Sequence, residues 1–326
     1  MRRNDEIQQI FWVGFRQREP FSIFRNFNVN FNQWFAETFG LEKRYFGGNV
    51  NAQWMFKNYW GMGGGISRDG KSISTETLRG GPALVYDGGW NPWIYIDSDN
   101  RKKIQLSFNY FNYRRDHKTA THHSANFGIR WQISDALNVS LEPGISKRYE
   151  ETEYISLPDS LDENIYFRGK IEQSTTYLTL RLNYNITPDF TVQLYAMPFI
   201  SAGKYSEFKR ITDSKADKYY DRYIQYTDEQ VSYDTENEIY NIDEDMNGVP
   251  DIRFDQPNFN VFDFNSNLVI RWEYRPGSTV YLVWSQNRSE SFNYGNFDLL
   301  EDIKTLFLET YPRDIFLVKF SYRFGL

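Results

Sequence analysis

Apolar and polar side chains alternate along most of this chain with a period of two. In one segment, Phe27, Val29 and Phe31 alternate with asparagines. The final segment places Phe316, Val318, Phe320, Tyr322 and Phe324 on one face and Leu317, Lys319, Ser321 and Arg323 on the other. Successive side chains of a strand point to opposite faces of the sheet. The pattern therefore predicts ribbons with one aromatic and aliphatic face and one polar face.

Repeated along the chain, this alternation predicts an all-β protein with about fourteen strands, and bacterial transmembrane barrels have an even number. The predicted strands lie near residues 6–16, 21–36, 48–57, 60–69, 74–86, 92–98, 103–114, 122–133, 138–149, 173–185, 190–204, 264–275, 278–290 and 314–324. The assignment is weakest around the glycine-rich stretch 61–65 and the turn-forming residues 79–92. No repeat or flexible linker divides the chain, so we expect a single domain over residues 1–326.

The connections between these strands differ in length. Short turns at 134–137, 186–189 and 275–278 alternate with long polar segments at about 150–173, 205–263 and 291–313. Short periplasmic turns and longer outer loops are typical of outer-membrane barrels. We therefore predict a transmembrane antiparallel up-and-down β-barrel, with the longest outer loop at about 205–263.

Composition narrows the classes further. Aromatic residues make up 18% of the chain, yet the mean hydropathy is -0.66. No apolar run approaches the ~20 residues that a membrane helix needs. The net charge of -6 and the lack of a basic stretch disfavour nucleic-acid binding. The chain has no cysteine, which excludes disulfides, iron–sulfur clusters and thiol catalysis.

A soluble β-sandwich also alternates apolar and polar residues, so the polar face needs closer attention. It carries charges in strand after strand, and we predict that these line the lumen: Arg130, Glu142, Arg148, Arg181, Arg271, Glu273, Lys319 and Arg323. Aromatic residues lie near predicted strand ends, where interfacial girdles occur: Trp34, Trp60, Trp93, Tyr113, Trp131, Tyr184, Trp272 and Trp284. The charges could line an aqueous passage or pair across a filled lumen. We favour a narrow or plugged lumen, because long loops commonly fold inward.

Several segments resemble a known family. They are Pro20–Arg25, Leu78–Pro82, Asp99–Lys103 and, most distinctively, Arg271–Thr279 with the sequence RWEYRPGST. Together they resemble the C-terminal β-barrel region of Bacteroidota outer-membrane proteins. These proteins contain a domain of unknown function and an upstream family-9 carbohydrate-binding-like domain. The resemblance covers most of the chain and supplies no catalytic residues.

The resemblance implies an outer-membrane location in a Gram-negative bacterium, with an upstream region in which glycoside-related activity could reside. It also implies that Met1 is internal to a longer protein, which agrees with the absence of an apolar signal core after Met1. The expected partners are the lipid bilayer, the barrel-assembly machinery through the C-terminal strand, and glycans or other outer-membrane proteins. A barrel-assembly signal usually ends on an aromatic residue, and Phe324 would fill that role although Gly325 and Leu326 follow it.

One acidic segment resembles a calcium loop. Asp243, Asp245 and Asn247 alternate before Gly248, as in the first half of an EF-hand loop. Val249 could offer its carbonyl oxygen, and Asp251 stands at a ninth position that often binds through water. The twelfth position is Phe254 instead of a bidentate glutamate. The alternatives are a structural calcium that braces the outer loop and a solvated acidic loop without an ion.

The three histidines, His117, His122 and His123, lie in one predicted outer hairpin. With Asp116 and Ser124 they could form a hydrolase site, but no nucleophile turn of the GxSxG type is present. Their spacing also lacks the fourth ligand of a typical zinc site. We therefore predict a non-enzymatic barrel that anchors, or forms a conduit for, an upstream glycan-binding domain. The alternatives are a soluble β-rich carbohydrate-binding module and, less favoured, a barrel hydrolase that uses His117 or His122.

Overall fold

A computed structural model describes residues 5–156 and 165–324. One large antiparallel sheet dominates it, and the long strands follow one another in sequence order. They are β1 (Ile7–Gln17), β2 (Phe24–Glu37), β3 (Lys43–Phe56), β4 (Gly61–Asp69), β7 (Gly89–Asp97), β8 (Ile104–Arg115), β9 (Ala120–Gln132), β10 (Leu137–Tyr154), β11 (Phe167–Thr187), β12 (Phe190–Ile211), β17 (Phe259–Arg275), β18 (Ser278–Phe292) and β19 (Arg313–Ser321). Predictions for residues 1–4, 157–164 and 325–326 lie outside the described residues.

The all-β prediction is confirmed, and so is the strand number, although not the identity of every strand. The sheet has fourteen strands, the fourteenth being the short β13 (Tyr223–Gln225), which pairs with the far end of β12. The predicted strand 74–86 is wrong. Only β5 (Ser72–Ser74) and β6 (Leu84–Tyr86) are extended there, and they form a separate small sheet. Positive φ angles at Arg79 and Gly80, followed by Pro82, break the strand between them.

The two faces of the large sheet differ in polarity. Directly opposite residues of antiparallel strands project to the same face. One row across eight strands is wholly apolar: Ile104, Trp131, Val139, Leu182, Leu194, Leu268, Trp284 and Phe316. The neighbouring row, on the other face, is mainly polar: Gln105, Arg130, Ser140, Arg181, Tyr195, Asn267, Ser285 and Ile315. We call these the outer face and the inner face.

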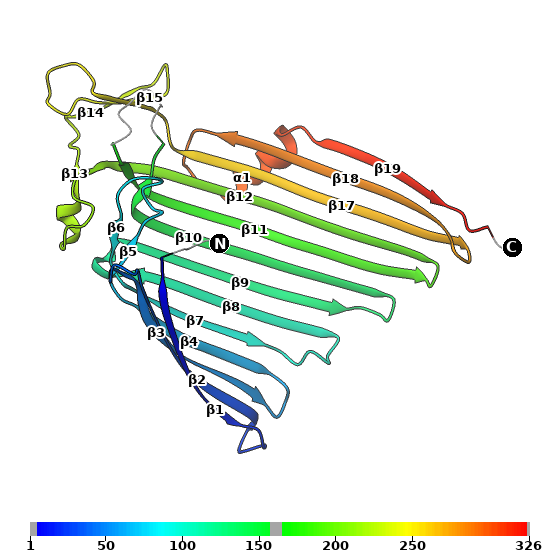
Figure 1. Ribbon diagram of the computed structural model, residues 1–326. Coiled ribbons are helices and arrows are strands. Elements are labelled where there is room, and N and C mark those ends of the chain that lie inside the picture. The colour runs from blue at the N-terminus through cyan, green and yellow to red at the C-terminus, as the bar shows by residue number, and fades with distance from the viewer. Residues whose placement is uncertain (1–4, 157–164, 325–326) are drawn as a thin grey trace.

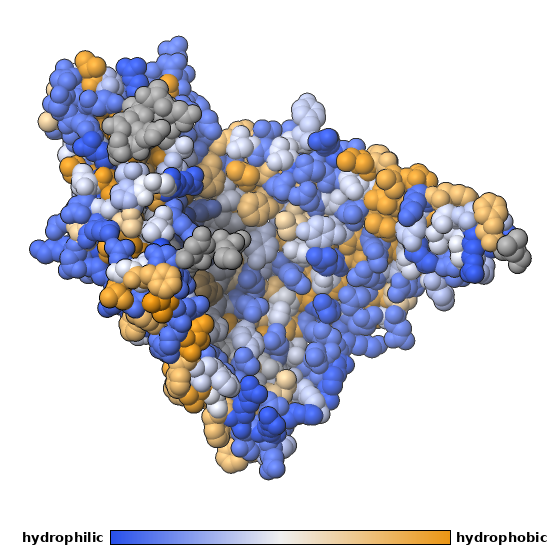
Figure 2. Space-filling model, in the orientation of Figure 1, coloured by the Kyte–Doolittle hydropathy of each residue, from blue (hydrophilic) through white to orange (hydrophobic). Residues whose placement is uncertain are grey.

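The sheet bends into an open trough (Figure 1). Figure 2 looks into its hollow, where mostly hydrophilic side chains gather. At one end, which we call the turn end, every connection between strands is short. The connections there range from two residues, as at 276–277, to six, as at 18–23. At the other end, the loop end, lie the long connections 70–88, 155–166, 212–258 and 293–312. No pairing joins β1 to β19 among the described residues, so the closed barrel predicted from the sequence is not found in this part of the chain.

The longest connection folds into a structure of its own at the loop end. It contains η2 (Tyr219–Arg222), β13 and the three-stranded sheet of β14 (Val231–Asp234), β15 (Ile239–Ile242) and β16 (Ile252–Asp255). Its apolar residues pack on the tops of β11 and β12 in a core of Ile155, Phe167, Phe208, Tyr226, Ile242, Ile252 and Phe254. We call the segments 72–86 and 205–258 together the cap. The predicted polar loop therefore has a hydrophobic core.

The connection from β18 to β19 contains the only α-helix of the described residues, α1 (Leu299–Lys304), followed by the π-helical turn η3 (Thr305–Glu309). Leu306 is fully buried against Ile200 and Phe262, which project to the outer face. This segment therefore covers the outer face near the loop end. Among the described residues, no helix is long and apolar enough to cross a membrane.

Candidate functional site

The charged residues predicted to line a lumen lie, with one exception, on the inner face. Arg130 and Arg181 occupy the polar row given above, and Glu142 and Arg148 follow Ser140 at even spacings on β10. Arg271, Glu273 and Lys319 keep the same phase on β17 and β19. Arg323 lies beyond the end of β19, where its backbone N–H donates to Ser278 Oγ at 3.0 Å.

The inner-face charges make local contacts and form no single cluster. Arg271 pairs with Glu273 on its own strand at 2.5 Å, and Arg148 pairs with Glu153. The Arg181 guanidinium lies 4.8 Å from the ring centre of Tyr195. Asparagine side chains also bond one another between β2 and β3, where Asn30 donates to Asn51 at 2.9 Å. The inner face is thus a hydrophilic wall in which many polar groups bond their neighbours.

Toward the turn end, the wall is hollowed by a cavity of about 500 Å³. Arg130 and Glu142 both line it, together with Gln53, Tyr95 and Asp97. Gly128 faces the same space, and at its position a Cβ atom would come within 2.3 Å of Ser107 Oγ. The volume falls within the range of small-molecule sites, and its lining could hold a polar solute or water.

At the loop end, one segment of the cap crosses the mouth of the trough. We call residues 212–222, between β12 and β13, the strap. Lys215 of the strap pairs with Glu42, between β2 and β3, at 2.8 Å, and Asp217 pairs with Lys71, beyond β4. Six strands of the sheet lie between β12 and β3. Around the wall that is a path of roughly 34 Å, given a strand spacing of about 4.8 Å. The strap leaves β12 and returns to it, since the Thr212 N–H donates to the carbonyl oxygen of Arg222 at 3.0 Å, so it reaches over the hollow from the side of β12.

Two buried ion pairs hold this arrangement together. Arg222 of the strap forms a two-pronged pair with Asp87 at 2.9 and 3.0 Å, and both side chains are under a tenth exposed. Arg115 and Glu150, which project from β8 and β10 to the inner face, pair at 2.6 and 3.0 Å. The Arg115 guanidinium also lies over the ring of Tyr86 in β6. The Arg222–Asp87 pair therefore fixes the strap to the connection between β6 and β7, and the ring contact of Arg115 fixes β6 to the inner face.

Sequence reasoning did not identify these four charged residues. They are spread over positions 87 to 222, and no short motif marks them. Other polar side chains of the cap are also buried. Lys209 is 1% exposed, and its Nζ donates to the carbonyl oxygens of Glu151 and Glu207 at 3.2 and 3.1 Å. Burial raises the pKa of Tyr219 and that of Tyr226, so both phenols stay protonated far above neutral pH.

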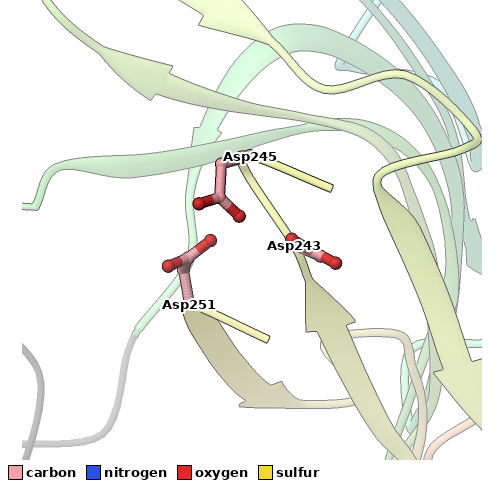
Figure 3. A group of neighbouring side chains, drawn as sticks. All are labelled: Asp243, Asp245 and Asp251. Carbon is pink, nitrogen blue, oxygen red and sulfur yellow. The ribbon is translucent and has the colours of Figure 1, made fainter. Parts of the chain in front are cut away.

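The acidic loop predicted to bind calcium joins β15 to β16 (Figure 3). One carboxylate oxygen each of Asp243, Asp245 and Asp251 lies within 4.8 Å of the others. The Asp243 carboxylate accepts from the backbone N–H groups of Asn247 and Gly248, at 3.1 and 2.7 Å. Gly248 has a φ of +90°, which suits glycine at this tight turn. The three aspartates thus converge as the sequence predicted.

The other predicted ligands of this loop are less clearly placed. Asn247 Oδ1 already accepts from the N–H of Val249, at 2.8 Å. Phe254, at the position where an EF-hand has its bidentate glutamate, is 1% exposed and packs in the core of the cap. The loop therefore offers an oxygen donor set of the kind that Ca²⁺ takes, in a β-hairpin instead of a helix–loop–helix. An ion there would offset the repulsion of three carboxylates and brace the hairpin.

The histidines do not assemble the suggested hydrolase site. Asp116 forms a two-pronged ion pair with Arg68, at 2.9 and 2.5 Å. His122 Nε2 lies 2.8 Å from Ser146 Oγ, instead of bonding Ser124, and His123 contacts Tyr110 and Asn112. His122 and His123 belong to opposite faces of β9. A single serine–histidine hydrogen bond provides neither an oriented acid nor an oxyanion hole.

Comparison with known families identifies the one to which the chain belongs. The chain belongs to the family of the domain of unknown function DUF5916, whose model covers residues 1–324. Neither a curated protein nor a solved structure matches the chain. The function must therefore be argued from the chain's own faces, cavities and cap.

Proposed function

We propose that this chain forms the wall of a transmembrane β-barrel in the outer membrane of a Gram-negative bacterium. It serves as a membrane anchor or a plugged conduit for an upstream glycan-binding domain, and it carries out no catalysis in this region. The observation that supports the proposal most strongly is the outer face. Its apolar row runs unbroken across the eight strands from β8 to β19, and no other segment of the described chain covers most of it.

The energetics favour lipid against this face. Leaving one large apolar side chain in water instead of burying it costs about 1.5–3 kcal/mol. On the outer face Phe11, Trp131, Trp284 and Phe316 are all more than a third exposed, and Phe316 reaches 74%. Soluble monomers rarely expose a contiguous apolar patch larger than a few hundred Å². Hydrocarbon around the trough removes this cost, while the inner face keeps its amides and charges in water.

The segment α1–η3 fits the same arrangement. It rests on the outer face near the loop end, and beyond its buried Leu306 it exposes Leu300 and Leu308, with the exposed Tyr311 just after it. Amphipathic segments of this kind lie in the headgroup region with their apolar side chains toward the acyl chains. In this arrangement α1–η3 marks the outer boundary of the apolar band.

The position of the strap favours a plugged lumen rather than an open pore. It reaches across the hollow at the loop end and is held by the buried pair Arg222–Asp87, which is costly to break. A solute that entered from the turn end would meet the cavity beside Arg130 and Glu142 first and the cap afterwards. The resting protein therefore conducts little, and the cap is the surface offered to the outside.

Migration in gels tests the proposal that the protein is a membrane barrel. The detergent-folded protein should migrate differently before and after boiling, because a folded barrel keeps its compact form in cold detergent. Solubility in plain buffer without such a shift would contradict the proposal. Glycan binding measured by calorimetry in detergent-free buffer would then favour the soluble carbohydrate-binding alternative.

The test of the plug is conductance in planar bilayers. The wild-type protein should show no conductance. Asp87→Ala, which removes the partner of Arg222 in the strap, should give fluctuating conductance. The control is Glu301→Gln, which breaks only an exposed ion pair with Lys304. A stable channel in the wild type would contradict the plug and leave the proposed membrane barrel intact.

A further inference from the structure

The two edges of the large sheet are long, apolar and unpaired. Every residue of β19 is exposed, as is every residue of β1 except Gln17. In the described part of the chain, each strand pairs with a neighbour on one side only, β1 with β2 and β19 with β18. Within residues 5–156 and 165–324, no strand lies beside the other edge of either strand. Exposed, flat, apolar edges are templates for another strand, and folded proteins normally cover or pair them.

The edge strands also differ from the strands between them on the inner face. Trp12 lies opposite Asn32, and its Nε1 donates to Asn30 Oδ1 at 3.2 Å, so it projects inward together with Ile10. On β19, Ile315 lies opposite Ser285 and Leu317 opposite Val283, so both project inward. Each edge therefore carries two large apolar side chains on its inner face, beside polar ones such as Arg16 and Lys319, whereas the middle of the inner face is mainly polar. Polar solvent along the inner side of these edges would leave all four side chains exposed.

The direction of the edges limits what can pair with them. Thirteen strands form the path from β1 to β19, and each is antiparallel to the next. β1 runs from the loop end to the turn end, and β19 does the same. A direct seam between them would be parallel, the only parallel pairing along this path. The ribbon also places the two edges on opposite rims of the trough (Figure 1).

We propose that an odd number of further strands, antiparallel to both edges, fills the gap between β19 and β1. With an odd addition every pairing around the wall becomes antiparallel and the total becomes even. The proposed source is the polypeptide that precedes β1. A strand that rises from the turn end finishes at the loop end, where a hairpin leads into β1, and consecutive strands are usually neighbours. The inference concerns closure of the sheet and holds whether or not lipid covers the outer face.

The chemistry of the edges describes this closing segment. Beside Phe11, Phe15, Phe316 and Phe320 its outward residues are apolar, to continue the outer face. Its inward residues next to Trp12 and Leu317 are apolar or small. A second copy standing in the same orientation presents the same two co-directional edges, so it could only form parallel seams. The closing segment is therefore a different stretch of sequence from residues 5–324.

Photo-cross-linking in native membranes tests the inference on the whole protein as its cells make it. Benzoylphenylalanine replaces Phe15 on β1 in one variant and Phe320 on β19 in another. The control replaces Phe127 in the middle of the sheet, between β8 and β10. After irradiation, mass spectrometry identifies the attached peptides. Both edge variants should attach to peptides that precede β1 in the same polypeptide, without a dimer band, and the control should not.

Cysteine pairs give a second measurement, because the chain has no cysteine of its own. Val13→Cys with Phe31→Cys, a directly paired position on β2, should form a disulfide. Val13→Cys combined in turn with cysteine at Phe316, Val318 or Phe320 should not, since one intervening strand already separates Cα atoms by about 9–10 Å. A β1–β19 disulfide or cross-link, a cross-linked dimer, attachment to a segment after β19, or edge adducts to lipid and flanking strands alone would each overturn the inference.

Discussion

The cap and the large sheet, which we call the wall, differ in how their apolar side chains are buried. In the cap, Ile242, Ile252 and Phe254 are at most 1% exposed, because they pack against one another and against Phe167 at the end of β11. In the wall, a single layer of strands has only backbone between its two faces, so Trp131, Trp272 and Phe316 stay exposed on the outer side. Aromatic and aliphatic side chains are thus buried in the cap and exposed on the outer face of the wall.

The difference shows where each region obtains its stability. The cap is held by its own core, by the buried pair Arg222–Asp87 and by the contact of Arg115 with Tyr86, so it should behave as a small globular unit does. The wall is held by its hydrogen-bond ladder and by whatever surrounds the outer face. Changes in the cap should therefore act in any medium, whereas changes in the wall should depend on face and on lipid.

The largest effect is expected for Asp87→Asn. It leaves the Arg222 guanidinium buried without a counter-charge, which should cost about 3–5 kcal/mol. The strap should then detach, and limited proteolysis within residues 212–222 should accelerate strongly. Glu301→Gln, in an exposed pair, should change stability by less than about 1 kcal/mol. Equal protease resistance of Asp87→Asn and the wild type would show that the pair does not hold the strap.

The second prediction compares the two faces at adjacent positions of β8. Phe108→Arg places a charge on the outer face and should destabilise the lipid-embedded protein by about 2–4 kcal/mol. Asn109→Arg projects to the inner face and should cost much less, because its charge stays in water. Urea unfolding in liposomes measures both. If the two variants were equally stable, the assignment of the outer face to lipid would fail.

The third prediction concerns the acidic hairpin of the cap. If it binds calcium, an ion concentration ten times the dissociation constant should stabilise the hairpin by about 1.4 kcal/mol. The fluorescence of the cap's tyrosines during thermal unfolding would report this shift, and Asp243→Asn should abolish it. Asp255→Asn is the matched control, since Asp255 lies in the same hairpin outside the cluster. An unchanged transition in the wild type with calcium would identify a solvated acidic loop.

The smallest effect is expected at the turn end. Arg101 forms a two-pronged pair with Asp99 at 2.8 Å and lowers the pKa of that carboxyl to about 2. Because the folded pKa lies below the ordinary value of 3.8, the pair contributes stability above pH 3.8 that disappears as the pH falls through about 2. Asp99→Asn should therefore flatten the acid limb of the stability curve slightly between these values. An identical acid limb in both proteins would contradict a role for this pair.

Much of the fold could be predicted because a strand's two-residue period is a local property. The alternation around Phe27, Phe108 and Phe316 makes thirteen of the predicted strands overlap observed ones, with ends that differ by at most seven residues, as at the end of β12. The prediction failed at 74–86, where Leu78 and Leu84 look like strand residues. They pack instead with Ile211 and Tyr219 in the cap, more than a hundred positions away. Periodicity cannot show which partner an apolar residue will find.

The candidate sites divide in the same way. The sequence determined by itself which charges share the inner face and which aspartates converge near Gly248, because both follow from spacings of a few residues. Only the tertiary structure decided that Arg222 meets Asp87, that residues 212–222 cross the hollow and that β1 and β19 run in the same direction. Those facts depend on the path of the whole chain, since each joins residues separated by long stretches of sequence. Strand periodicity sets the face of a side chain, whereas the folded path sets its neighbours.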